Sequence, residues 1–296
     1  MTETLDLPLQ LGDAQTHAGL TITPLFPTRN PVCDYVSLDA ALAGELEITE
    51  LGRDGVVNRV AVHNPLDRAV LLYDGEELIG AKQNRVINRS VLVTPHTRLV
   101  VPVACVERGR WAHRSRRFDL AGHVAGPELR RRKALSLENG AGEHKLQSEV
   151  WAAVDDRLAH HAVASPTRAQ RDGVAARRSQ IGDLMAHFAL EPGQCGMVAA
   201  IAGRGWCLDA VSRPEVFGPL LPRLMAGYAY ELSEVAGKAT PAAAALEALA
   251  AAGVRRLTSP GLGDDLQFEA AGLVGTGLAI GDEMVQISAY GWSATR

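Results

Sequence analysis

Residues 56–73 read VVNRVAVHNPLDRAVLLY, two apolar runs on either side of a short polar turn. Asn64, Pro65 and Asp67 are typical turn residues, because proline fixes φ and Asn and Asp side chains bond to their own backbone. The flanking valines and leucines favour short strands. This stretch therefore predicts an antiparallel β-hairpin, and the rest of the N-terminal half repeats its pattern.

Two further strands are expected after the hairpin, at residues 86–93 and 98–106, with the turn Thr94-Pro95-His96-Thr97 between them. Short apolar strands that are broken at regular intervals by Pro and Asn turns are typical of a β-sandwich or a partial barrel. We therefore expect Val57 to Val106 to form antiparallel strands of one sheet system, with no long helix inside it.

The second half of the chain alternates helical and extended patterns. Apolar residues recur at helical spacing within residues 145–162 and 167–190, and Pro214 and Pro241 each stand in the first turn of a further expected helix. Neither half shows a strict β-α-β rhythm, which argues against a doubly wound parallel sheet. Strands are expected at residues 197–202, 206–211, 266–269, 273–280 and 284–290.

The predicted fold class is therefore α+β. It comprises an antiparallel β-rich N-terminal lobe that is a sandwich or partial barrel, a helical connecting segment, and a C-terminal antiparallel sheet with helices. The three parts are assigned to residues 19–120, 121–190 and 191–296. The middle part is set apart because its composition is basic and its apolar spacing is helical.

Composition limits the classes of protein to consider. The 296-residue chain is 47% hydrophobic and 22% charged, which supports a packed globular fold. Its net charge of −4 argues against nucleic acid and against a membrane surface as partners. The acidic start, Met1 to Asp6, lacks the pattern of a secretory signal, so we expect a cytoplasmic protein. Four scattered cysteines are expected to be free thiols.

Several catalytic signatures are absent from the sequence. It contains no P-loop, no Gly-x-Ser-x-Gly elbow and no His-Glu-x-x-His zinc pair. The histidines and cysteines show no metal-ligand spacing, so no metal site is predicted, and no cofactor is assigned. These absences leave open whether the chain is an enzyme.

The densest polar segment lies between two apolar strands and reads Asp74-Gly75-Glu76-Glu77-Leu78-Ile79-Gly80-Ala81-Lys82-Gln83-Asn84-Arg85. Long polar connections on a rigid sheet are a frequent place for binding residues. Glu76 and Glu77 are the candidate catalytic acid or base. Because strand side chains alternate between faces, we expect Glu77 to face inward and Glu76 to meet solvent. The candidate ligand-binding residues of this segment are Lys82, Gln83, Asn84 and Arg85.

A family resemblance appears in the same region. Residues 75–85 (GEELIGAKQNR), 102–111 (PVACVERGRW) and 115–118 (SRRF) resemble the signature of the family named for its association with ADP-ribosyl-glycohydrolases and rhodanese-like phosphatases. The similarity is stronger in the N-terminal half than in the rest of the chain. The resemblance implies a bacterial domain linked by association to ADP-ribose or phosphate metabolism, and it carries over no catalytic residue.

A basic segment from Arg108 to Lys133 follows these motifs. Guanidinium groups bind phosphates in a bidentate manner, and tryptophan stacks on nucleobases. Arg110 and Trp111 lie beside the motifs and are therefore added to the candidate ligand-binding residues. The run from Arg130 to Lys133 is expected to be a solvated face that balances nearby acidic residues.

Two functional hypotheses follow. In the first, the loop from Glu76 to Arg85 joins Arg110 and Trp111 in a site that binds or processes a phosphorylated or ADP-ribose-like small molecule. In the second, the same charged loop is the homo-oligomer contact of a non-catalytic interaction or assembly protein. Self-association into a homo-oligomer is expected because symmetric oligomers are common among soluble proteins.

Overall fold

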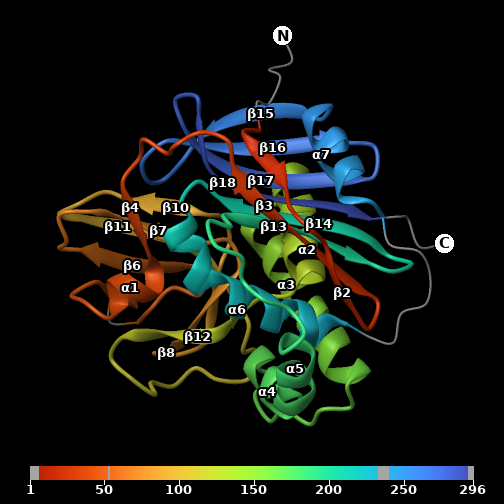
Figure 1. Cartoon of the computed structure of the whole chain (residues 1–296). Coiled ribbons are helices and arrows are strands. Elements are labelled where there is room, and N and C mark those ends of the chain that lie inside the picture. Colours follow the sequence, from red (N-terminus) through yellow and green to blue (C-terminus); the bar gives the residue numbers. More distant parts are fainter. Residues whose placement is uncertain (1–6, 53, 233–239, 293–296) are drawn as a thin grey trace.

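The structure is a computed structural model that describes residues 7–52, 54–232 and 240–292. Within these ranges it contains seven helices and eighteen strands, almost all of the strands in antiparallel pairs. The α+β fold class predicted from the sequence is confirmed. One large sheet lies beside two smaller ones, and helices pack between and around them (Figure 1).

The nine-stranded sheet combines both ends of the chain. Its strands are β1 (Leu9–Leu11), β2 (Gln15–His17), β3 (Leu20–Pro27), β13 (Gly196–Ile201), β14 (Gly205–Val211), β15 (Gly253–Thr258), β16 (Asp264–Ala270), β17 (Leu273–Ile280) and β18 (Glu283–Trp292). The order is β1-β3-β13-β14-β18-β17-β16-β15, and β2 pairs with β3. The predicted C-terminal strands are thus present, whereas β15 was missed. Because β3 pairs with β13, the segment 19–120 contributes to this sheet, and the division into three parts stays a prediction.

Two smaller sheets hold the N-terminal motifs. Their strands are β4 (Tyr35–Ser37), β5 (Glu47–Glu50), β6 (Arg59–Asn64), β7 (Ala69–Leu72), β8 (Glu76–Gly80), β9 (Arg85–Ile87), β10 (Val91–Val93), β11 (Thr97–Cys105) and β12 (Phe118–Val124). One sheet has the order β12-β8-β9-β11-β6-β5 and the other β10-β7-β4. The span from Val57 to Val106 contains no helix in the described chain, but its strands belong to two sheets and not to one system.

The predicted hairpin at residues 56–73 is wrong. Strand β6 pairs with β5 and β11, whereas β7 pairs with β10 and, in parallel, with β4. The reason is that β7 is buried on both faces: Ala69 and Leu71 belong to one apolar core, and Val70 and Leu72 to another. Strand β6 alternates between buried residues and residues that are exposed or partly exposed, so it suits an outer layer and not a position beside β7.

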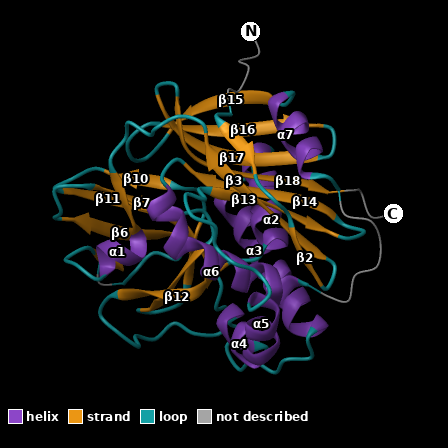
Figure 2. Ribbon diagram, in the orientation of Figure 1, coloured by secondary structure: helices purple, strands orange, loops and turns teal. Residues whose placement is uncertain are grey.

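Helices connect and cover the sheets (Figure 2). They are α1 (Leu38–Leu42), α2 (Pro127–Glu138), α3 (Glu143–His160), α4 (Gln170–Ala176), α5 (Arg178–Met185), α6 (Pro214–Glu231) and α7 (Ala242–Ala250). The helix expected at 167–190 is divided into α4 and α5. Helix α7 packs Ala245 and Leu249 on one face of the large sheet, and α6 contributes to the core on the other face. No helix in the described ranges is long and apolar enough to cross a membrane.

Helix α2 corrects the expectation for the basic run. Arg130 and Lys133 are 0% and 1% exposed, so they are not part of a solvated face. Residues three apart lie on the same side of a helix, and this side of α2 faces the buried carboxylates of Asp74 and Asp209. Only Arg131 and Arg132, on the other side, reach the surface.

Candidate functional site

The polar stretch of residues 74–85 forms strand β8 and the turn that leads to β9. Its expected site residues are mostly buried, and only Lys82 is partly exposed. Those less than a tenth exposed are Glu76, Glu77, Gln83, Asn84 and Arg85. The turn residues Gly80 and Ala81 have φ values of 116° and 37°, so the alternation of faces assumed for an extended strand stops there.

Glu76 is not the solvent-facing residue that we expected. Arg223 on α6 donates to Glu76 Oε1 over 2.5 Å, and the Tyr73 backbone N–H donates to Oε2 over 2.8 Å. Burial raises the pKa of Glu76, and the nearby Arg223 guanidinium opposes that rise. The sequence did not indicate that a distant helix would cover this face of β8.

Glu77 faces the interior, as expected, but its partners differ from those predicted. Its Oε2 accepts hydrogen bonds from His123 Nε2 and Gln170 Nε2, each over 2.8 Å. Its Oε1 accepts a longer bond of 3.3 Å from Asn84 Nδ2. Glu76 and Glu77 therefore lie in two separate polar clusters on opposite faces of β8.

Arg110 is an anchor for the chain around it. Its guanidinium forms a two-bond ion pair with Glu107 and donates 2.7 Å bonds to the carbonyl oxygens of Ala81 and Ala112. It also reaches Asn84 Oδ1 at 3.2 Å. Burial alone would raise the pKa of Glu107, but the hydrogen bonds from Arg110 hold it below its ordinary value. The donors of Arg110 are thus engaged within the chain.

Arg85 lies at the centre of the remaining candidates. Its Nη1 donates to Gln83 Oε1 over 3.1 Å, while Nε and Nη2 have no hydrogen-bond partner among the described residues. Glu50 Oε1 is 3.9 Å from Nη2. The guanidinium lies 5.6 Å from the ring centre of Trp111, which is 46% exposed, and Lys82 Nζ lies 5.3 Å from the same ring centre. The fold thus brings the candidate ligand-binding residues together, yet none of them lines the cavity described next.

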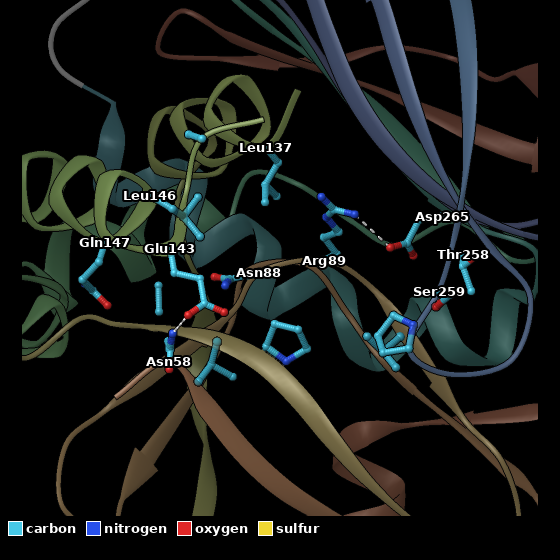
Figure 3. Close-up of a pocket in the computed structure, with 16 residues that line it drawn as sticks. Asn58, Asn88, Arg89, Leu137, Glu143, Leu146, Gln147, Thr258, Ser259 and Asp265 are labelled. Carbon is cyan, nitrogen blue, oxygen red and sulfur yellow. Dashed lines mark hydrogen bonds and ion pairs between the residues drawn. The ribbon is translucent and has the colours of Figure 1, made fainter. Parts of the chain in front are cut away.

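A cavity of about 490 Å³ lies between the large sheet and the two smaller sheets (Figure 3). One wall comes from the β9–β10 connection and from β11, a second from the α2–α3 connection, and a third from the segment between β15 and β16. Sequence reasoning missed this site because the three walls are far apart in the chain. The one available signal was the pair Asn88-Arg89 inside a segment that was otherwise expected to be an apolar strand.

Three polar residues meet in this cavity. Arg89 Nη1 donates to Asp265 Oδ2 over 3.1 Å, as the dashed line in Figure 3 shows. Asp265 Oδ1 and Asn88 Oδ1 are buried and have no hydrogen-bond partner in the described chain. Burial raises the pKa of Asp265, and Arg89 opposes that rise. Since buried polar atoms in proteins are usually hydrogen-bonded, these two acceptors indicate a place for a water molecule or a ligand donor.

The opposite end of the cavity is held by polar contacts on its rim. Glu143 at the start of α3 accepts hydrogen bonds from Asn58 and, over 2.8 Å, from Arg59 Nη2. Gln147, one turn further along α3, bonds to both the N–H and the C=O of Cys105 over 2.8 and 2.9 Å. These contacts tie α3 to β11, so this wall of the cavity is built on rigid elements.

A second hollow, of about 530 Å³, lies beyond the end of α2. Glu138 and Glu269 both line it, and their carboxyl groups are close enough to share a proton. Burial and the neighbouring Glu269 raise the pKa of Glu138 to about 7, while Arg255 opposes the rise.

This pair predicts a pH-dependent stability. A carboxyl group whose pKa is higher in the folded than in the unfolded state contributes stability at low pH that is lost as pH rises through the folded value. Glu138→Gln is therefore expected to be more stable than the parent at about pH 8, and the gain should shrink toward zero as pH falls to 4.5. Urea unfolding at several pH values measures this, with the exposed Glu247→Gln on α7 as control. A gain that is independent of pH would contradict the shared proton.

The described residues contain no group of three or more His, Cys, Asp or Glu side chains placed to hold a metal ion. The four cysteines all fall within the described chain, and each is a free thiol.

Comparison with known families agrees with the motifs around β8 and β9. Residues 8–290 match the family described as the ARG and Rhodanese-Phosphatase-superfamily-associated Protein domain. The chain belongs to this family. The match includes strands of all three sheets, so the domain includes the cavity as well as the N-terminal motifs. No curated protein and no solved structure matches the chain.

Proposed function

We propose that this domain binds, and processes, a phosphorylated small molecule that carries hydroxyl groups, such as a sugar phosphate or an ADP-ribose-like compound, in the cavity at Arg89. The observation that supports it is one cavity of about 490 Å³ that combines a cation with two buried acceptors lacking partners, Asn88 Oδ1 and Asp265 Oδ1. The cytoplasmic setting expected from the sequence is part of the same proposal.

Each polar group has a distinct role in this proposal. Only Nη1 of Arg89 contacts Asp265, and Nε and Nη2 have no partner among the described residues. This edge of the guanidinium is the fork that binds phosphate oxygens in pairs. Asn88 Oδ1 and Asp265 Oδ1 accept hydrogen bonds from ligand hydroxyls. The apolar residues between them, including Val91, bury the rest of the ligand, which is the usual composition of a small-molecule site.

Asp265 is also the residue placed for chemistry. A carboxylate that accepts a hydrogen bond from a ligand hydroxyl is positioned to accept its proton, and a pKa raised toward the working pH favours such a base. In this proposal Asp265 takes the role that the sequence suggested for Glu76 or Glu77, because its free oxygen faces a cavity whereas theirs are bonded within the chain.

The test compares ligand binding by variants of two arginines, Arg89 and Arg256, each of which forms an ion pair with an aspartate. Arg89→Gln is expected to weaken binding of a phosphorylated ligand roughly tenfold to a hundredfold, because it removes charge-assisted hydrogen bonds. Arg256→Gln makes the same change in the exposed Arg256–Asp264 pair, which does not line the cavity, and should leave binding unchanged. Thermal shift and calorimetry with ribose 5-phosphate, ADP-ribose, unphosphorylated ribose and inorganic phosphate measure the effect.

Three outcomes would contradict the proposal. The first is that none of these compounds raises the melting temperature. The second is that ribose binds as tightly as ribose 5-phosphate. The third is that Arg89→Gln and Arg256→Gln lose the same affinity for the phosphorylated ligand. Asp265→Asn, with Asp264→Asn as control, separates binding from chemistry, since it should abolish turnover of a ligand that still binds.

A further inference from the structure

The loop at residues 108–117, RGRWAHRSRR, carries five arginines and no acidic residue, and the proposed cavity uses none of it. Arg110 is the buried anchor described above. The other side chains of the loop that matter here are exposed, namely Arg108, Trp111, Arg114, Arg116 and Arg117. An exposed basic segment can form a defined binding surface only if the fold holds it in one conformation.

The loop is held against the turn between β8 and β9. Arg110 donates to the carbonyl oxygens of Ala81 in that turn and Ala112 in the loop, each over 2.7 Å. The Ala81 N–H donates to Ser115 Oγ over 2.9 Å, and the Arg114 N–H donates to Ala81 O over 2.9 Å. These bonds hold the backbone on both sides of Trp111.

Two cations, Arg85 and Lys82, lie near the ring of Trp111, and nearly half of the residue is exposed. The fully buried Arg85 lies 5.6 Å from the ring centre, so the indole meets it from the inner side, while 46% of the residue stays exposed. A planar aromatic ring that is fixed and open on one side is the stacking platform used for nucleobases.

The arginines beside Trp111 are placed for phosphates. Two nearby acids pair with the loop: Glu107 is buried against Arg110 and lies 3.7 Å from Arg114 Nη2, and Glu47 pairs with Arg117. Arg108 lies over the ring of Trp151 at 4.9 Å, and Arg116 is exposed and has no ion-pair or hydrogen-bond partner among the described residues. The segment therefore keeps a local positive charge within a chain whose net charge is −4. Salt screens charges beyond about 8–10 Å, so the distant acids do not cancel it.

We infer that this loop is a binding surface for single-stranded nucleic acid, with one base stacked on Trp111 and neighbouring phosphates on Arg114 and Arg116. Several cations spread along ten residues match a strand with successive phosphates better than a single nucleotide. The surface is separate from the cavity at Arg89, so either site can be present without the other.

The test is fluorescence anisotropy with a labelled oligothymidylate of about 12 nucleotides, which suits one stacking site with flanking phosphate contacts. Trp111→Ala should weaken binding about 5- to 100-fold, and Trp111→Tyr should restore most of it, because a stacking face returns. Arg116→Ala should lower the slope of log K against log salt by about 0.7. Arg98→Ala, an exposed arginine near the far end of β11, is the matched control and should change nothing.

The inference is overturned if the parent protein fails to bind the oligonucleotide at low salt. It is also overturned if Trp111→Ala binds like the parent, or if Arg98→Ala weakens binding as much as Arg116→Ala. Equal competition by adenosine monophosphate would show that the loop takes a mononucleotide and not a strand. Melting curves check that each variant is folded, and the exposed Arg116→Ala provides the test if Trp111→Ala is not. Arg89→Gln should bind the oligonucleotide normally, which separates this result from the proposed function.

Discussion

Asp209→Asn is expected to lower the free energy of unfolding by about 3–5 kcal/mol, because it removes the charge opposite a fully buried arginine. Asp209 and Arg130 are both 0% exposed and joined through two nitrogens of the guanidinium. The hydroxyl groups of Tyr73 and Tyr228 each donate to the same carboxylate over 2.7 Å. Burial alone would raise the pKa of Asp209, but Arg130 and these hydrogen bonds hold it below its ordinary value.

The effect of this substitution has a matched surface control. Arg132 also pairs with an aspartate, Asp156, over 2.9 Å, but that carboxylate is 61% exposed. Asp156→Asn should therefore change stability by only about 0–1 kcal/mol. Urea unfolding at neutral pH measures both variants. A loss of less than about 1 kcal/mol for Asp209→Asn would mean that Asp74, 3.5 Å from Arg130 Nε, is a sufficient partner by itself.

The second large effect concerns the two neighbouring glutamates. Glu76→Gln should cost about 3 kcal/mol, because Arg223 is 9% exposed and would lose its 2.5 Å buried carboxylate partner, keeping only the 3.3 Å pair with the partly exposed Asp39. Glu77→Gln should cost roughly 1–3 kcal/mol, because the amide oxygen can still accept from His123 and Gln170, and only the longer 3.3 Å bond from Asn84 Nδ2 would meet a donor in place of an acceptor.

This order reverses the expectation from the sequence, in which Glu77 carried the large effect and Glu76 the small one. The comparison is sharp because the two residues are adjacent and undergo the same chemical change. Urea unfolding of both variants decides it. A larger loss for Glu77→Gln, or equal losses, would show that the Glu76–Arg223 pair contributes no more to stability than the contacts of Glu77. Arg223→Met combined with Glu76→Gln should recover part of the loss if the buried arginine, left with only Asp39, is its cause.

Local sequence patterns were sufficient for the elements whose partners are adjacent in the chain. The pairs β13–β14 and β17–β18 follow from apolar runs separated by glycine turns, and each strand pairs with the next one. The helices at Pro214 and Pro241 follow from the preference of proline for helix starts: Pro214 is the first residue of α6, and Pro241 immediately precedes α7. In these cases the information that determines the structure is contained within a few neighbouring residues.

Local patterns failed where the partner of an element is distant. The run Ala69–Leu72 is apolar at every position, and such a run shows that both faces are buried but not which strands lie beside it. The pairing of β7 with β4 and β10 depends on two cores that meet at this strand. The predicted hairpin was therefore wrong although both of its strands exist.

The sequence by itself determined the fold class, most of the C-terminal strands and the membership of a domain family, because periodicity and long motifs are local properties. Only the tertiary structure decided which charges are buried and where a ligand can bind. Arg130 is paired because Asp209 approaches from 79 residues away, and Arg89 faces a cavity because Asp265 approaches from 176 residues away. A charged residue in a sequence has the same identity in water and in a core. Its environment is set by the segments that fold against it, and a local sequence pattern does not identify those segments.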